Sequence, residues 1–159
     1  MSEILSAESL ARIDREVAKY PPERRQSAVM AALRIAQEEK GWLSVETLDA
    51  VAELLDLRPI QVYEVATFYS MYDLEPVGRH KICVCTNVSC MLRGSEEIMR
   101  HLQARLGIQP GETTPDGRFT LKEVECLAAC GGAPMMQIGK HYYENLTPER
   151  VDEILEGLE

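Results

Sequence analysis

The sequence predicts an α/β chain in which an N-terminal four-helix unit is followed by a domain with the element order β-α-β-β-β-α. Two observations lead to this fold class. Residues 1–76 repeat apolar residues at helical spacing and contain no cysteine, whereas residues 78–159 alternate short apolar runs with helical patterns. All five cysteines lie in the second stretch. We therefore expect two domains, residues 1–76 and residues 78–159.

Four stretches of the first domain carry the apolar stripe of a helix that packs against a core. They are residues 10–20, 28–36, 44–55 and 60–72. Local signals mark their ends. Pro21 and Pro22 stop the first helix, and Gly41 suits the C-cap of the second. Ser44 is a candidate N-cap for the third helix, and Pro59 fits the first turn of the fourth.

The second domain begins with a strand and a helix. Residues 81–85 are apolar on both faces, which is typical of a central strand. Ser95 is then expected to cap a helix that Gly107 ends. A turn at residues 116–117 precedes a strand over residues 119–125. The apolar alternation of this strand changes phase near its end, so we expect a bulge or a strand end there.

The last elements are a hairpin and a helix. Residues 135–138 and 141–143 flank a two-residue turn at 139–140, which predicts a hairpin. A helix opens at residues 147–148, where a proline follows a capping threonine. Pro134 stands just before the hairpin and is a candidate for a cis peptide bond.

The charge of the chain excludes several classes of partner. The 159 residues hold 17 Lys and Arg against 26 Asp and Glu, a formal net charge of −9. Nucleic acids and anionic membranes require clustered basic residues, so neither is an expected partner. No apolar run has the roughly 20 residues of a membrane span. The N-terminus lacks the pattern of a secretory signal, and we expect a cytoplasmic protein.

Four of the five cysteines form two closely spaced pairs. Cys85 and Cys90 follow the first strand of the second domain, and Cys126 and Cys130 follow the second strand. If these strands are neighbours, both loops open at the same end of the sheet. Four thiolates then converge, which is the geometry of a metal–thiolate site. The small residues between and after the cysteines leave backbone N–H groups able to point at sulfur.

Alternatives to a redox centre remain open on spacing alone. The two pairs also suit a structural zinc site in a protein-interaction module, and four buried structural thiols are the plainest interpretation. A Cys2His2 site does not fit, because His101 and His141 are too far apart. The sequence has no Cys-x-x-Cys motif for thiol–disulfide exchange and no plant-type ferredoxin spacing. It also has no phosphate-binding glycine loop and no nucleophile–base motif, so no catalytic residue is expected.

The fifth cysteine, Cys83, is expected to be a small buried hydrophobe rather than a ligand. It shares a strand face with Cys85. However, it lies deeper in the strand than the loop in which the ligands converge.

The cysteine motifs and the residues around them resemble one known family. The segments are Cys85-x4-Cys90-x2-Arg93-Gly94, TTPDGRFTL at residues 113–121, and EVECLAACGGAP at residues 123–134. GWL at residues 41–43 and VATFYSM at residues 65–71 look like the helical domain of the same family. Together these stretches resemble the thioredoxin-like 2Fe–2S ferredoxin subunit of NADH:quinone oxidoreductase, respiratory complex I.

This resemblance implies a site, a partner and a location. It implies one 2Fe–2S cluster held by Cys85, Cys90, Cys126 and Cys130, with the first pair on one iron and the second pair on the other. It implies a partner subunit that binds FMN and NADH and carries a 4Fe–4S cluster, in a complex at the cytoplasmic face of the bacterial inner membrane. Equivalent subunits serve NAD-linked formate dehydrogenases and hydrogenases, so those parent enzymes are alternatives.

Acidic and aromatic residues suggest two further expectations. Glu123 and Glu125 precede Cys126, and negative charge near an iron–sulfur cluster disfavours reduction, so we expect a low reduction potential. Four aromatic residues gather at the end of the helical domain and are either its core or part of a docking surface. They are Tyr63, Phe68, Tyr69 and Tyr72.

Overall fold

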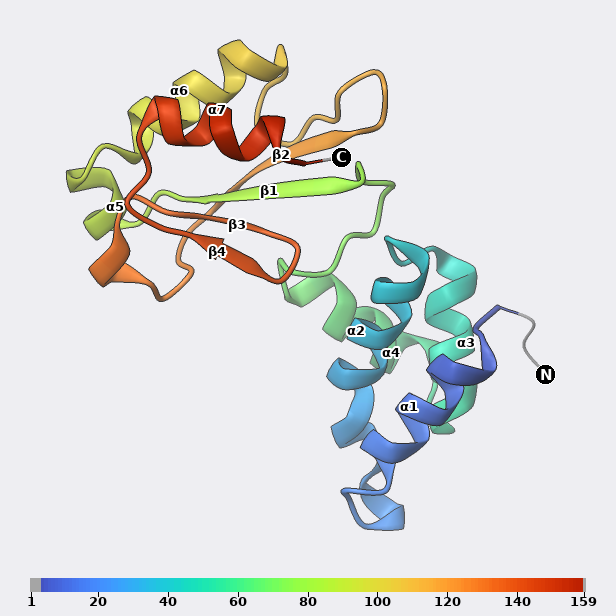
Figure 1. Ribbon diagram of the computed structural model, residues 1–159. Helices are drawn as coiled ribbons and strands as arrows, with labels where there is room; N and C mark the ends of the chain where they lie inside the picture. The colour runs from blue at the N-terminus through green and yellow to red at the C-terminus, as the bar shows by residue number, and fades with distance from the viewer. Residues whose placement is uncertain (1–3, 159) are drawn as a thin grey trace. The chain divides into compact units, whose positions relative to one another are not determined.

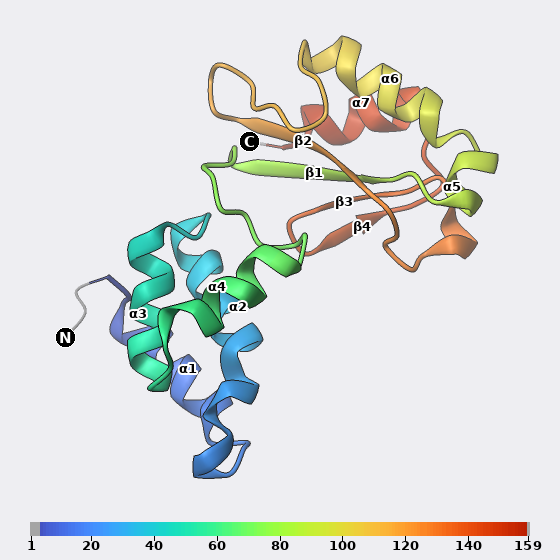
Figure 2. The same cartoon turned by 180° about the vertical axis from the view of Figure 1, so that it is seen from behind.

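The computed structural model describes residues 4–158. Its internal contacts divide the chain into two compact units, with the boundary in the sequence between Pro76 and Val77. The first unit is helical, and the second contains the sheet (Figures 1 and 2). None of the helices within residues 4–158 is long and apolar enough to cross a membrane.

The described part of the first unit, residues 4–76, has four α-helices and one 3-10 helix. Their bounds are α1 Ala7–Val17, η1 Pro22–Ala28, α2 Val29–Lys40, α3 Val45–Leu55 and α4 Pro59–Phe68. Three predicted helix ends are confirmed. Gly41 ends α2 with φ 83°, the Ser44 hydroxyl accepts from the Thr47 N–H at the start of α3, and Pro59 opens α4.

The apolar pattern predicted that the fourth helix ends at Tyr72. Helix α4 instead ends at Phe68. The segment after α4 is held against α2 by hydrogen bonds that involve side chains. Gln37 accepts from the Asp73 backbone N–H at 2.7 Å and donates to the Met71 carbonyl at 3.0 Å. The Tyr72 hydroxyl donates to a carbonyl of α2 at 2.9 Å. These hydrogen bonds give the backbone groups of Met71 and Asp73 partners outside a helix, so α4 ends before it reaches them.

The 3-10 helix η1 was not expected from the sequence, and it closes the end of α3. From η1, the Arg25 guanidinium donates to the carbonyls of Leu54 and Leu55 at 2.7 and 3.2 Å. Carbonyls at a helix C-terminus have no partner within the helix, and a basic group there is favourable.

Side chains from all four α-helices form the core of this unit. Its most buried members include Ile13, Leu33, Ile35, Ala36, Val51, Leu55, Val62 and Ala66. The aromatic cluster is split between core and surface: Tyr72 is buried, whereas 79% of Phe68 is exposed.

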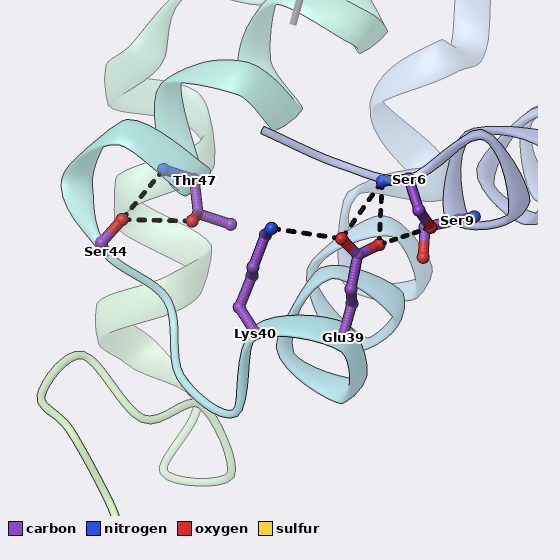
Figure 3. Close-up of polar contacts among 6 residues, drawn as sticks. All are labelled: Ser6, Ser9, Glu39, Lys40, Ser44 and Thr47. Atoms are coloured by element: carbon purple, nitrogen blue, oxygen red, sulfur yellow. Dashed lines mark hydrogen bonds and ion pairs between the residues drawn. The ribbon is translucent and has the colours of Figure 1, made fainter. Parts of the chain in front are cut away.

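The start of α1 is fixed by a carboxylate from α2. The Ser6 side chain accepts from the Ser9 N–H as the N-cap of α1. The Ser6 backbone N–H and hydroxyl both donate to Glu39, at 3.1 and 2.9 Å, and Lys40 lies 3.2 Å from the same carboxylate (Figure 3). A carboxylate at a helix N-terminus is favourable because the N–H groups there lack partners within the helix.

Over residues 77–158 the second unit contains a four-stranded mixed sheet in the order β2-β1-β3-β4. Its elements are β1 His80–Cys85, α5 Val88–Leu92, α6 Ser95–Leu106, β2 Phe119–Val124, η2 Cys130–Gly132, β3 Met136–Ile138, β4 His141–Tyr143 and α7 Pro148–Glu156. The predicted order is confirmed, with α5 and η2 added. Strand β1 is internal, as its apolar faces indicated.

Two of the local predictions for the sheet are confirmed. Ile138 pairs with His141 across the predicted two-residue turn, and Gly139 has φ 58°. The Ala133–Pro134 peptide bond is cis. Strand β2 keeps an unbroken parallel register with β1 and ends at Val124, so the change of phase marks a strand end rather than a bulge.

Helices α6 and α7 pack together and supply a large part of the core of this unit. Its most buried members are Ile82, Val84, Leu102, Leu121, Met136 and Val151. The predicted cap of α6 is wrong by one residue. Gly94, with φ 95°, is the N-cap, and Ser95 is the first residue of the helix. Within the described chain, the buried Ser95 hydroxyl has no hydrogen-bond partner.

Candidate metal centre

Both cysteine pairs begin at the same end of the sheet. Strands β1 and β2 are parallel neighbours, and Cys85 pairs with Val124 at the end of the ladder. The Thr86 N–H donates to the Val124 carbonyl at 3.0 Å and extends the pairing by one residue. The Cys85 sulfur lies 3.8 Å from the carbonyl oxygen of Glu125, the residue before Cys126. In both views α5 and the orange turn of η2 lie at this end (Figures 1 and 2).

The short helix α5 returns Cys90 to Cys85. The Asn87 side chain accepts from the Val88 N–H at 2.7 Å, which caps the helix. One turn later Cys90 points inward, and both cysteines are almost fully buried, with 4% of Cys85 and 2% of Cys90 exposed. They share a small apolar cluster with Ala133 and Met135.

Burial changes the acid–base chemistry of this first pair. It raises the pKa of the Cys90 thiol to about 11, and a side-chain hydrogen bond with Cys85 acts in the same direction, while the Met135 backbone opposes both. A buried thiol of this kind stays protonated near neutral pH. A bound metal ion supplies the positive charge that makes such a thiol a thiolate ligand.

The second pair lies in a more open loop. Cys126 and Cys130 are both exposed. The Ala128 N–H donates to the Cys126 sulfur at 3.3 Å, and Ala128 adopts φ 58°, a conformation that non-glycine residues rarely take. This N–H is placed to stabilise negative charge on sulfur, as the small residues of the loop suggested.

A neighbouring segment supports the end of this loop. The Asn145 N–H donates to the Gly132 carbonyl at 2.7 Å, and the Leu146 N–H donates to the Pro134 carbonyl at 3.0 Å. The Glu144 side chain fills the space beside Gly132, so that a Cβ there would be 2.5 Å from the Glu144 Cδ. The loop after Cys130 therefore has a fixed backing.

The structure brings Cys85 and Cys90 together but does not arrange all four paired cysteines as metal ligands. Cys85 and Cys90 share the buried cluster, and Cys130 is among the neighbours that raise the pKa of Cys90. Cys126 lies exposed at the start of its loop. Among residues 4–158, no three His, Cys, Asp or Glu side chains are arranged to hold a metal ion. A four-cysteine ligand set therefore stays a prediction.

Cys83 differs from its expectation. It lies in β1 opposite Lys122 and Gln137, and it is half-buried rather than a core residue. It is not part of the apolar cluster that holds Cys85 and Cys90.

Sequence reasoning missed three features of the site. The cap of α5 was readable from Asn87 two residues after a strand. The support by Glu144 and a hydrogen bond from Thr86 to Glu123 (2.8 Å) carry no sequence signal, because each joins residues that are distant in the chain.

Comparisons with known proteins place this chain in a family. The family model for the thioredoxin-like [2Fe-2S] ferredoxin matches residues 13–159. The chain is 51% identical over 145 residues to an NADH-quinone oxidoreductase subunit of Rhizobium meliloti, covering 91% of this chain and 85% of that protein. It is 47% identical over 143 residues to an NADH-quinone oxidoreductase subunit of Rickettsia bellii, covering 89% of this chain and 86% of that protein.

A solved structure is also similar. An NAD+-reducing [NiFe]-hydrogenase in its air-oxidized state matches with a TM-score of 0.72 and 26% identity, over 82% of this chain. The match spans only 22% of the hydrogenase chain.

These similarities confirm several predictions made from the sequence. They are the α/β class with a thioredoxin-like domain, a single 2Fe–2S cluster as cofactor, and an electron-transfer role as a subunit of the NADH-quinone oxidoreductase type. The relatives are named as subunits, which supports a partner within a complex. The chain belongs to the thioredoxin-like [2Fe-2S] ferredoxin family.

Proposed function

We propose that Cys85, Cys90, Cys126 and Cys130 hold the 2Fe–2S cluster, the first pair on one iron and the second pair on the other. The observation that carries this proposal is the parallel pairing of β1 and β2, which starts both loops at one end of the sheet. The contact of the Cys85 sulfur with the Glu125 carbonyl supports it further, because it brings the first pair to the start of the second loop.

The donor set fits an iron–sulfur cluster. Four cysteine thiolates are its usual ligands, and hydrogen bonds to sulfur tune its potential. The Ala128 N–H already points at the Cys126 sulfur. Gly131 and Gly132 add no side chain to the loop after Cys130. When bound, the cluster supplies a carrier for one electron at a time.

The two cysteine pairs differ in burial, and we assign them different roles in the site. Cys85 and Cys90 anchor one side in a dry apolar cluster, which excludes water from the sulfurs. Cys126 and Cys130 are exposed and form the side that a second carrier can approach. We infer that this exposed loop faces the electron-exchange partner.

The partner in this proposal is the subunit that binds FMN and NADH and carries a 4Fe–4S cluster, in a complex at the cytoplasmic face of the inner membrane. The subunit names of the bacterial relatives support such a complex. The hydrogenase similarity favours a second candidate, an equivalent role in an NAD-linked hydrogenase.

Single cysteine variants test the ligand set. We expect two irons and two acid-labile sulfides per chain in the parent protein, and a rhombic EPR signal after dithionite reduction. Serine at Cys85, Cys90, Cys126 or Cys130 should remove or change this signal. Cys83→Ser is the matched control and should keep both the metal content and the signal.

Two results would contradict the assignment. Equal loss of iron from Cys83→Ser and Cys85→Ser would make Cys83 a ligand. A colourless protein that holds zinc without sulfide would favour the structural zinc site.

A further inference from the structure

Thr86 joins the two cysteine-bearing segments by two hydrogen bonds of different kinds. Its backbone N–H donates to the Val124 carbonyl at 3.0 Å, which is an ordinary extension of the sheet. Its hydroxyl donates to the Glu123 carboxylate at 2.8 Å, which joins two side chains. Thr86 directly follows Cys85, and Glu123 lies three residues before Cys126.

The register places the backbone of Glu123 close to that of Cys85, although their side chains lie on opposite faces of the sheet. Glu123 pairs with Val84, so Glu123 and Thr86 are neighbours on one face of the ladder, one step from its last pair. From the strand spacing of about 4.8 Å and the rise of about 3.3 Å per residue, the Cα atoms of Glu123 and Cys85 are about 6 Å apart. Glu123 is exposed, so without a partner its side chain has several rotamers open to it in water.

We propose that Thr86 is a positioning residue for the redox centre, which holds the Glu123 carboxylate in place so that its negative charge lowers the reduction potential. This inference rests on the proposed ligand set of four cysteines. Reduction adds one negative charge to the cluster, and a fixed carboxylate nearby opposes that charge. A carboxylate that moves in solvent is further away on average and more strongly screened, so its effect is smaller.

Potentiometric titration of the full chain with its cluster, followed by EPR, tests the inference. Glu123→Gln removes the charge but keeps an oxygen that can accept from Thr86, and the potential should rise. Thr86→Val removes the hydroxyl, keeps the backbone N–H and keeps the charge. It should raise the potential in the same direction, by no more than Glu123→Gln. Thr86→Ser keeps a hydroxyl donor and should stay at the parent value.

Double variants separate positioning from a general effect on the loop. In Glu123→Gln the change Thr86→Val should add nothing, because the charge that it positions is gone. Glu125→Gln removes an equal charge that Thr86 does not hold, and with it the effect of Thr86→Val should be retained in full. The potential is read from the fraction of chains that bind the cluster, so a lower cluster content does not obscure it.

Three results would overturn the inference. They are a parent potential in Glu123→Gln, a parent potential in Thr86→Val, and a Thr86→Val effect that adds fully to that of Glu123→Gln. Failure of the ligand set itself is seen separately, as retention of an unchanged cluster in Cys85→Ser or Cys126→Ser.

Discussion

Gly132 and Glu144 lie against one another so closely that glycine is required at position 132. An added Cβ would be 2.5 Å from both Cδ and Oε2 of Glu144 and 2.6 Å from its Cβ. The last of these atoms is fixed to the backbone and cannot swing away. The neighbouring Gly131 has no atom within 4 Å of the same position. The adjacent glycines after Cys130 therefore have different roles.

We expect Gly132→Ala to displace the loop after Cys130. Overpacking of this kind typically costs about 1–3 kcal/mol, and here the strain falls on a segment that bears a proposed ligand. Iron content per chain and the thermal midpoint should both fall. Gly131→Ala is the control and should match the parent protein in both measurements. Similar losses in the two variants would show that space beside Glu144 is not what selects glycine.

The αL backbone of Ala128 predicts a stabilising substitution. The left-handed conformation costs a non-glycine residue about 1 kcal/mol or more. A glycine avoids this cost, but its greater freedom in the unfolded chain offsets part of the gain in stability. Ala128→Gly should therefore raise the thermal midpoint slightly while the cluster is retained. Ala129 has an ordinary φ of −113°, so Ala129→Gly should lower the midpoint. A lower midpoint in Ala128→Gly would contradict the strain argument.

The parts of the fold that follow from local chemistry were predictable from the sequence. Gly41, Ser44 and Pro59 mark helix ends because each acts through its own backbone conformation or a neighbour a few residues away. The end of α4 was not predictable, because the hydrogen bonds of Gln37 to Met71 and Asp73 decide it from another helix. An apolar pattern carries no information about such a competitor.

The candidate site shows the same division. Two cysteine pairs after two strands were enough to expect that their loops share one end of the sheet, and the parallel register agrees. The half-buried state of Cys83 was not expected, because strand alternation does not say which face of a sheet is covered by helices. Likewise the contact between Gly132 and Glu144 joins separate loops and leaves no periodic signal.

Leu33 is expected to be critical for the helical unit alone. It is completely buried among the helices of that unit, and a buried Leu→Ala change typically costs about 2–5 kcal/mol. Leu33→Ala should lower the free energy of unfolding by that amount, measured by urea denaturation with far-UV circular dichroism. The same preparation should keep its iron content at low denaturant. Met30→Ala on the same helix removes a partly exposed side chain and should cost about 0.5 kcal/mol or less.

Glu39 links the stability of the helical unit to acid pH. Its pKa is lowered from 4.5 to about 2, chiefly because the Ser9 hydroxyl hydrogen-bonds to the carboxylate. Hydrogen bonds from Ser6 and Lys40 lower the pKa further, whereas the loss of solvent around the carboxylate raises it. A folded-state pKa below the unfolded value means that folding favours the ionised form. The stabilisation is complete above about pH 4.5 and is lost as the pH falls towards 2.

Urea denaturation at a series of pH values measures this linkage. The parent protein should lose stability between about pH 4.5 and 2, whereas Glu39→Gln has no charge to lose at this site and should show a shallower decline. The difference in unfolding free energy between the two proteins should therefore shrink as the pH falls. Ser9→Ala removes the largest contribution and should reduce the same difference.

Thr67→Ala is the matched control, because it deletes a hydroxyl that donates to the carbonyls of Tyr63 and Glu64. Its effect on stability should be the same across the acid range, since these backbone carbonyls do not titrate. If Glu39→Gln and the parent protein declined in parallel between pH 4.5 and 2, Glu39 would not be the group that titrates. The carboxylate at the start of α1 would then act only as a hydrogen-bond acceptor, a role that the glutamine retains.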